Sequence, residues 1–270
     1  MSRKKWTEET LFARLLNNKS DKTHWENIRE LRSRGSKEVF IKSVELINSD
    51  IAKERLIGAE ILSQLGLPPR PFIKQTFEIF FELLKTETNN LVISTMFYGI
   101  GHNSEHLKKK DIDFICTFKD NKNIEIKQGL VFALCGIDDN SAIDTLIDFT
   151  KDKRSSIRDW ATFGIGVQSD RDDLKIRAAL WNRVSDKHFK TRREAIFGLA
   201  KRKDKRIKEI LKKELETIDN HGSYMLEAIE EFQDKDFIDL LKQKIISNEI
   251  DKKINPEWLE NSIRKLMEIQ

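Results

Sequence analysis

Few side chains in this 270-residue sequence are arranged for catalysis or metal binding. His102 and His106 have helical spacing with Glu105 between them, a pattern that zinc sites use. The pair falls at the predicted end of a helix, so we expect a surface turn there and no metal site. Neither Cys116 nor Cys135 has an adjacent cation to activate a thiolate, and no glycine-rich phosphate loop occurs. We therefore expect no catalytic residue, no cofactor and no metal.

Basic residues gather in one stretch, which suggests the binding of phosphate groups. Residues 187–213 contain 12 Lys or Arg and 3 Asp or Glu, and basic patches of this kind bind nucleic-acid backbones. The candidate nucleic-acid-binding residues are Lys201, Arg202, Lys205 and Arg206. Their run spans a predicted turn between helices, where solvated charge is common. Solubility or an acidic protein partner are therefore the other interpretations.

The elements that carry these residues are copies of one repeated unit. Each copy is an apolar helix whose fourth and eighth residues are apolar or small, and successive copies begin 38, 34, 31, 34 and 33 residues apart. The copies begin at Arg55, Ile93, Lys127, Arg158, Arg192 and, more weakly, Met225. A second amphipathic stretch precedes each copy, so the unit is a helical hairpin, and hairpins repeated at this period form an α-solenoid.

The alternation of helices continues to both ends of the chain. The end helices are predicted at Thr7–Asn17, His24–Arg34, Phe237–Ser247 and Pro256–Ile269. The fold is thus predicted to be all-α, with about eight helix pairs in a single domain over residues 1–270. The clearest repeats span 37–216, and residues 1–36 and 217–270 are expected to cap them.

Charged residues recur at two fixed positions of the repeat. Arg or Lys begins four copies, and a turn or capping residue, such as Glu87 or Asp186, stands six residues before each copy. Turn carboxylates and helix-borne cations arranged in this way would tie successive repeats together. We expect these charges to be structural.

Several segments resemble HEAT-repeat proteins of bacteria, in particular a group of single-domain HEAT solenoids without assigned activity. The segments are Arg158–Gly166, Arg55–Gly66 and Trp25–Gly35, the last followed by Glu38-Val-Phe40. The resemblance covers roughly residues 24 to 216. It implies a right-handed, armadillo-like solenoid that serves as a scaffold or a binding surface.

Three groups of HEAT-related enzymes differ from this sequence. Deoxyhypusine hydroxylases carry His-Glu pairs for two iron ions, and no histidine here is followed by Glu. Nothing in the sequence singles out the tetrapyrrole site of phycobilin lyases. HEAT-like alkylpurine DNA glycosylases use Trp, Arg and a carboxylate in a basic groove, which Arg158-Asp159-Trp160 resembles superficially. That placement follows the repeat consensus instead, so the glycosylase stays an alternative of lower rank.

The second helix of each hairpin lines the concave face of a HEAT solenoid, so the resemblance places a partner there. Residues beside the core stripe of these helices reach that surface. The candidate partner-binding residues are Glu60, Gln64, Tyr98, His102, Asp159, Trp160 and Glu194. Rings interleaved with polar groups suit a protein or peptide segment. We expect a non-enzymatic scaffold or adaptor, with a nucleic-acid-binding protein as the alternative.

Composition indicates where such a protein acts. The net charge of +4 is too small by itself to indicate a polyanion partner. No apolar run approaches the roughly 18 residues of a membrane span, and no signal peptide is recognisable. Two cysteines cannot form a disulfide framework. We therefore expect a cytoplasmic protein without a membrane partner.

Overall fold

The computed structural model describes residues 3–219 and 222–269, and these contain sixteen α-helices and no β-strand. The helices follow one another as eight consecutive pairs. This confirms the prediction of an all-α repeat for the described part of the chain. None of the described helices is both long and apolar enough to cross a membrane.

Contacts within the chain group its residues into two compact units. The N-terminal unit is Met1–Leu134 and the C-terminal unit is Cys135–Gln270. Four helical hairpins belong to each unit, and each unit buries apolar residues of its own. The single domain over residues 1–270 stays a prediction.

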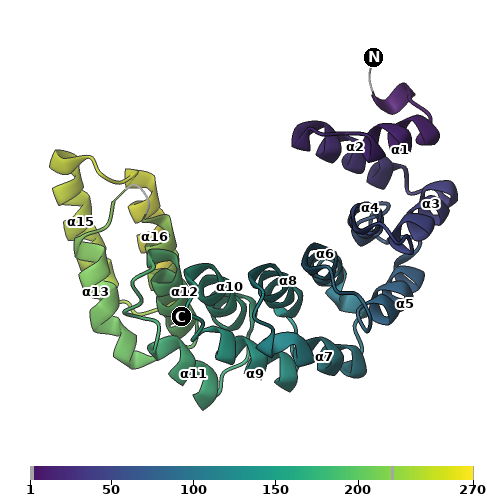
Figure 1. The fold of residues 1–270 in the computed structure, drawn as a ribbon. Coiled ribbons are helices and arrows are strands. Elements are labelled where there is room, and N and C mark those ends of the chain that lie inside the picture. Colours follow the sequence, from purple (N-terminus) through teal and green to yellow (C-terminus); the bar gives the residue numbers. More distant parts are fainter. Residues whose placement is uncertain (1–2, 220–221, 270) are drawn as a thin grey trace. The chain divides into compact units, whose positions relative to one another are not determined.

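The N-terminal unit stacks its hairpins through their second helices. Its helices are α1 (Glu8–Leu16), α2 (Asp21–Arg34), α3 (Lys37–Ile47), α4 (Ala52–Ser63), α5 (Ile73–Leu83), α6 (Asn90–Gly101), α7 (Lys109–Cys116) and α8 (Ile124–Leu134). Helix α2 packs on α4, α4 on α6 and α6 on α8, while α3, α5 and α7 lie along the other side (Figure 1). Ile61, Phe97 and Leu130 are completely buried in this row.

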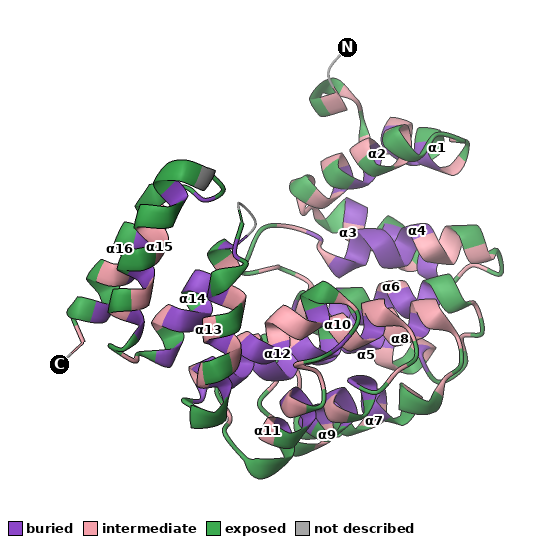
Figure 2. Cartoon of the chain, turned by 90° about the vertical axis from the view of Figure 1, so that its left-hand side faces the viewer, coloured by how far each residue is buried: buried purple, intermediate pink, exposed green. Residues whose placement is uncertain are grey.

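The C-terminal unit repeats this arrangement. Its helices are α9 (Asn140–Phe149), α10 (Ser155–Phe163), α11 (Leu174–Trp181), α12 (Phe189–Lys201), α13 (Lys208–Glu216), α14 (Ser223–Phe232), α15 (Phe237–Asp251) and α16 (Pro256–Met267). Helix α10 packs on α12, α12 on α14 and α14 on α16. Figure 2 shows long buried stretches on α12, the second helix of this row. Helix α10 continues directly into a π-helical turn, Gly164–Gln168.

Short polar segments start and stop the helices. The Ser36 hydroxyl accepts a hydrogen bond from the Val39 N–H at the start of α3, and the Asp173 carboxylate caps α11 in the same way. Gly35 ends α2 in the left-handed conformation with φ of 58°. These caps set the short hairpin turns that the sequence predicts.

Ion pairs between successive hairpins match the predicted ladder of charges. Arg55 forms a bidentate pair with Glu87, with Nε–Oε2 at 2.6 Å and Nη2–Oε1 at 3.0 Å. Arg158 pairs in the same way with Asp186, at 2.8 and 2.9 Å. The third nitrogen of each guanidinium donates to backbone carbonyls of the preceding turn, for example to Ser49 O at 3.0 Å. The structure thus confirms the structural role of these charges at two positions.

Glycines allow neighbouring helices to approach closely. A Cβ atom on Gly198 would lie 2.6 Å from the Cα atom of Gly166 in the turn that follows α10, and a Cβ on Gly58 of α4 would lie 2.6 Å from the backbone nitrogen of Ile47 on α3. Both neighbours are backbone atoms, which cannot move without shifting a helix. This close approach offsets the cost of about 1 kcal/mol that glycine carries in a helix.

Replacing Gly198 with Ala tests this close approach. Helix propensity alone predicts that the variant gains about 1 kcal/mol in free energy of unfolding. Because the new methyl group would meet the backbone of Gly166, we expect instead a loss of about 1–3 kcal/mol, measured by urea denaturation. A stabilised variant would contradict the packing described here.

Replacing Asp186 with Asn tests the ladder. Arg158 would lose its charged partner in a pair whose side chains are only 14% and 4% exposed, so we expect a loss of about 3 kcal/mol in free energy of unfolding. The control is Lys175→Ala, which removes an exposed pair with Asp144 and is expected to cost less than about 1 kcal/mol. Equal losses in the two variants would contradict a structural role for the ladder.

The ladder also predicts a dependence of stability on pH. Hydrogen bonds from Arg158 hold the pKa of Asp186 at about 2. Because the folded pKa lies below the unfolded value of about 4, this stabilisation is present above pH 4 and is lost as the pH falls towards 2. Urea unfolding at a series of pH values is expected to show this loss in the wild type and a smaller one in Asp186→Asn.

Candidate functional site

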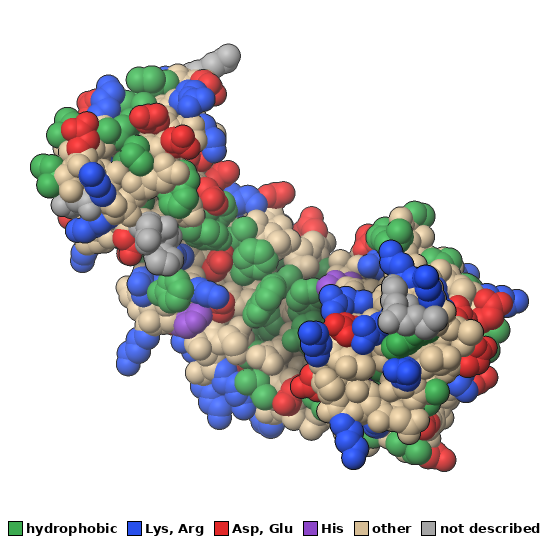
Figure 3. Space-filling view, turned by 90° about the horizontal axis from the view of Figure 1, so that it is seen from above, with side chains coloured by type: hydrophobic (Ala, Val, Ile, Leu, Met, Phe, Trp, Pro, Cys, Tyr) green, Lys and Arg blue, Asp and Glu red, His purple; other side chains and the backbone are tan. Residues whose placement is uncertain are grey.

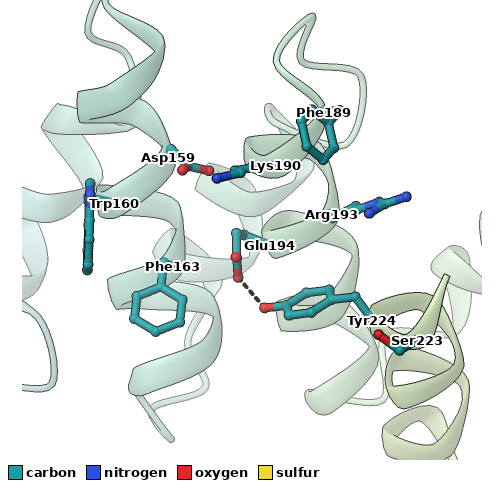
Figure 4. A pocket seen from close by; sticks show the side chains of 9 residues that line it. All are labelled: Asp159, Trp160, Phe163, Phe189, Lys190, Arg193, Glu194, Ser223 and Tyr224. Atoms are coloured by element: carbon teal, nitrogen blue, oxygen red, sulfur yellow. Dashed lines mark hydrogen bonds between the residues drawn. The ribbon is translucent and has the colours of Figure 1, made fainter. Parts of the chain in front are cut away.

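A groove of about 610 Å³ opens on the C-terminal unit along α10, α12 and α14. Figure 4 shows the residues that line it, namely Asp159, Trp160, Phe163, Phe189, Lys190, Arg193, Glu194, Ser223 and Tyr224. Three of the predicted partner-binding residues, Asp159, Trp160 and Glu194, therefore lie together. The second helices of three successive hairpins contribute to one surface.

A hydrogen-bonded carboxyl group lies at the centre of the groove. The Tyr224 hydroxyl of α14 donates to Oε2 of Glu194 on α12 (Figure 4). Burial raises the pKa of Glu194 to about 7, and the negative charge of Asp159 adds to this effect. Burial also raises the pKa of Tyr224, and the hydrogen bond to Glu194 contributes in the same direction. Near neutral pH Glu194 is thus poised between its charged and uncharged forms.

A second carboxyl group faces the groove from the neighbouring helix. The Oδ1 atom of Asp159 is buried without a hydrogen-bond partner, and His188 Nδ1 lies 3.8 Å away. Burial raises the pKa of Asp159, while the charges of His188 and Lys190 oppose this effect. Lys190 and Asp159 point toward one another in Figure 4. The groove therefore holds two incompletely solvated carboxyl groups on adjacent helices.

Aromatic rings line both sides of these carboxyl groups. Trp160 is 44% exposed and contacts Phe163 edge to face, with ring centroids 5.8 Å apart. On α12, Phe189 is 48% exposed, and the guanidinium of Arg193 lies 5.3 Å from its ring centroid. Exposed rings beside carboxyl groups can bind an apolar or a cationic side chain.

The described residues show no arrangement suited to metal chemistry. No group of three or more His, Cys, Asp or Glu side chains among them could hold a metal ion. Burial raises the pKa of Cys135 to about 12, so its thiol is not ionised at neutral pH.

Two of the predicted residues in the N-terminal unit are engaged within it. Glu60 is only 6% exposed, and its Oε2 lies 2.6 Å from Nε2 of His24 on α2. The side-chain oxygen of Gln64 accepts a hydrogen bond of 2.9 Å from Arg32, also on α2. Both residues join α2 to α4, so neither displays a free side chain on the surface.

The other two predicted residues of that unit are exposed. Tyr98 and His102 lie one turn apart on α6, and each contacts the ring of Phe132 on α8, with centroids 5.2 and 5.0 Å apart. They belong to the N-terminal unit and do not line the groove. That these seven residues contact a partner stays a prediction.

The run of basic residues is largely engaged in contacts within the C-terminal unit. Arg202 is only 6% exposed, and its guanidinium donates to the backbone carbonyls of Ile165, Gly166, Ser169, Arg171 and Gly198. It is therefore not displayed to a phosphate, contrary to what the charge run suggested. Lys201 pairs with Asp170, and Arg206 with Asp204, each at 2.6 Å.

Lys205 of the same run is exposed. On the face drawn in Figure 3, acidic side chains accompany the basic ones over much of the surface. Among residues 187–213, the ion pairs of Lys201 with Asp170 and of Arg206 with Asp204 reduce the charge excess locally. Nucleic-acid binding stays a prediction.

Sequence reasoning missed the groove residues that precede the recognised repeat copies. Phe189 and Lys190 come before the copy that begins at Arg192, and Ser223 and Tyr224 come before the one at Met225. Helices α12 and α14 begin two or three residues earlier than those copies. If each copy had been taken to begin at its helix cap, for example at His188 before α12, these side chains would have been among the candidates.

Comparisons with known proteins agree with the helical-repeat fold. No family model matches the chain. It is 28% identical over 258 residues to Protein YibA of Escherichia coli (strain K12), which covers 92% of this chain and 89% of that protein, and the same values hold for Protein YibA of Escherichia coli O157:H7. An X-ray structure of E. coli YibA matches with a TM-score of 0.77 and 25% identity over 98% of this chain and 94% of the other.

A crystal structure of an engineered protein also matches, with a TM-score of 0.59 and 14% identity over 96% of this chain and 77% of the other. This second match shows the fold alone. The chain is thus related to YibA over nearly its whole length, and its HEAT-family membership in the narrower sense stays a prediction.

The carboxyl groups of the groove give a measurable prediction. We expect the side-chain carboxyl carbon of Glu194 to titrate with a pKa of about 7 in NMR spectra. Asp159→Asn should lower that pKa because it removes a neighbouring negative charge, and Tyr224→Phe should raise it because it removes a hydrogen bond to the carboxylate. Shifts of the same sign in both variants would contradict the geometry described.

Proposed function

We propose that this chain is a non-enzymatic helical-repeat adaptor whose groove along α10, α12 and α14 binds a segment of a protein partner. The occupant is an extended peptide that places a Lys or Arg side chain between the two carboxyl groups. The observation that carries the proposal is that two carboxyl groups, those of Asp159 and Glu194, line one groove together with aromatic rings. The relation to YibA supports the repeat scaffold.

Charge complementarity favours a basic side chain. The two carboxyl groups repel one another when both are ionised, since the charge of Asp159 opposes ionisation of Glu194. A ligand cation placed between them would relieve this repulsion and satisfy the buried Oδ1 atom of Asp159. Lys190 already acts on both carboxyl groups, so it would compete with the ligand for the same charge.

The rings favour an apolar residue beside the basic one. Trp160 and Phe189 expose nearly half of their surface on the two neighbouring helices. Exposed aromatic side chains flanked by polar groups are the usual anchors of protein interfaces. A groove formed by packed helices is also preformed, so a peptide would bind without the cost of ordering it.

A peptide library displayed on phage or yeast tests the proposal. We expect peptides enriched on the whole protein to contain Lys or Arg next to an aromatic or aliphatic residue. For a selected peptide, we expect Glu194→Gln and Asp159→Asn to weaken binding about tenfold each and Lys190→Ala to strengthen it. Binding is read from the fluorescence of Trp160 and by calorimetry.

The matched control is Glu260→Gln, which removes an exposed carboxylate from α16, outside the groove lining. It should leave the affinity unchanged. Enriched peptides without basic residues, or equal losses in Glu194→Gln and the control, would overturn the proposal. Retention of DNA at low salt that Lys205→Ala abolishes would favour the nucleic-acid alternative.

A further inference from the structure

We propose that Arg32 and Arg70 of the N-terminal unit, with His102 beside them, form a binding site for a phosphate-type oxyanion. None of these residues lines the groove of the C-terminal unit, so this site is independent of the function proposed above. The ligand chemistry is that of a doubly charged phosphoryl group. Each guanidinium is held by neutral hydrogen-bond acceptors and lacks a carboxylate partner among the described residues.

Arg32 is fixed by neutral acceptors. Its Nε and Nη2 atoms donate to the backbone carbonyl of Glu60 at 2.9 and 2.6 Å, and Nη1 donates to the side-chain oxygen of Gln64 at 2.9 Å. Its guanidinium also lies 5.9 Å from the ring centroid of Trp25. These contacts orient the group without neutralising its charge.

Arg70 is held in a similar way from a loop. The Gly66 N–H donates to the backbone oxygen of Arg32 at 2.8 Å, which brings the loop after α4 back to α2. Arg70 Nη1 donates to the side-chain oxygen of buried Asn103 at 2.8 Å, and Asn103 donates in turn to the backbone oxygens of Ser63 and Gly99. The Nε atom of Arg70 is buried without an acceptor.

Neither guanidinium has a carboxylate partner. Throughout the described ranges, no Asp or Glu oxygen lies within 4 Å of a nitrogen of Arg32 or Arg70. Glu60 is the carboxylate whose charge acts on Arg32, and its Oε2 atom is already 2.6 Å from His24. A partly buried cation without a counter-ion is costly unless an anion completes it.

The positive charges act on one another. The pKa of Arg32 is lowered to about 10, mainly by burial; the charge of Glu60 opposes this effect and the charge of Arg70 adds to it. Burial and the charges of Arg32 and Arg70 together lower the pKa of His102.

Arg32 Nη1 donates to Gln64 at the end of α4, and Arg70 Nη1 donates to Asn103, which donates in turn to the backbone oxygen of the adjacent Ser63. The two guanidinium groups therefore lie at the same end of α4, and an anion bound there would relieve their repulsion.

The geometry favours a phosphoryl group over a single carboxylate. Arginine binds phosphate oxygens through paired N–H donors, and two permanently charged guanidinium groups match the charge of a dianion. Arg32 and Arg70 are half-buried and His102 is exposed, so the phosphoryl group can be free phosphate or a phosphorylated side chain of a peptide.

NMR of the arginine side chains tests the site directly. Inorganic phosphate is titrated into the whole protein at constant ionic strength, with sodium acetate as the parallel titration. We expect the Nε–H resonance of Arg70, assigned by its absence in Arg70→Met, to shift and saturate with phosphate and not with acetate. No saturable shift with phosphate, or equal shifts with both anions, would overturn the proposal.

Variants separate the site from general charge. Arg70→Met should weaken phosphate binding about tenfold, because it removes a donor of the site without touching the packing of α2 on α4. The matched control is Arg29→Met, which removes the same charge from an exposed position on α2 and should leave the affinity within about twofold. An equal loss in the two variants would also overturn the site.

Two peptides show whether the site binds free phosphate or a phosphorylated side chain. A short peptide with phosphoserine and the same peptide with serine are compared with free phosphate by calorimetry. Binding of the phosphopeptide more tightly than phosphate, abolished in Arg70→Met, assigns the site to phosphorylated chains. Equal affinity assigns it to the free ion, and either result supports an oxyanion site.

Discussion

Close approach of successive second helices is the constraint on which both units depend. A single hairpin cannot bury its apolar stripe alone, so each must press against the next. Gly198 and Gly166 meet backbone to backbone, where any side chain would separate α12 from the segment that follows α10. The ion pair of Arg158 with Asp186 then joins α10 to the turn between α11 and α12. Packing and ladder together hold the second helices in a fixed row.

This row of helices also creates the groove. Asp159 and Trp160 directly follow Arg158 in the sequence, so the residue that ties two hairpins together also positions two groove side chains. Glu194 comes from the next helix and Tyr224 from the one after. Helices packed this closely leave little water around the carboxyl groups, which is the physical reason for their raised pKa values.

Two arginines outside the ion pairs of the ladder, Arg202 and Arg70, use their donors in two ways, and the difference between these two kinds is informative. Arg202 is buried, but its N–H groups donate to five backbone carbonyls, so its donors are used within the fold. Arg70 donates to Asn103 and leaves its buried Nε atom without an acceptor. Net charge along the sequence pointed to the first kind, whereas the structure points to Arg70. Unsatisfied donors, and not charge density, mark the better candidate for an anion site.

The sequence by itself determined the helices and their repetition. Apolar periodicity and caps such as Asn255 are local, which is why helix α16 begins at the predicted Pro256, and the spacing of the copies predicted the ion pair of Arg158. Only the tertiary structure decided which surface residues meet. Gly66 in the loop after α4 reaches the backbone of Arg32 along a path that no repeat dictates, and the pKa of Glu194 depends on side chains from two other helices. Such contacts join residues distant in sequence, and local patterns carry no information about them.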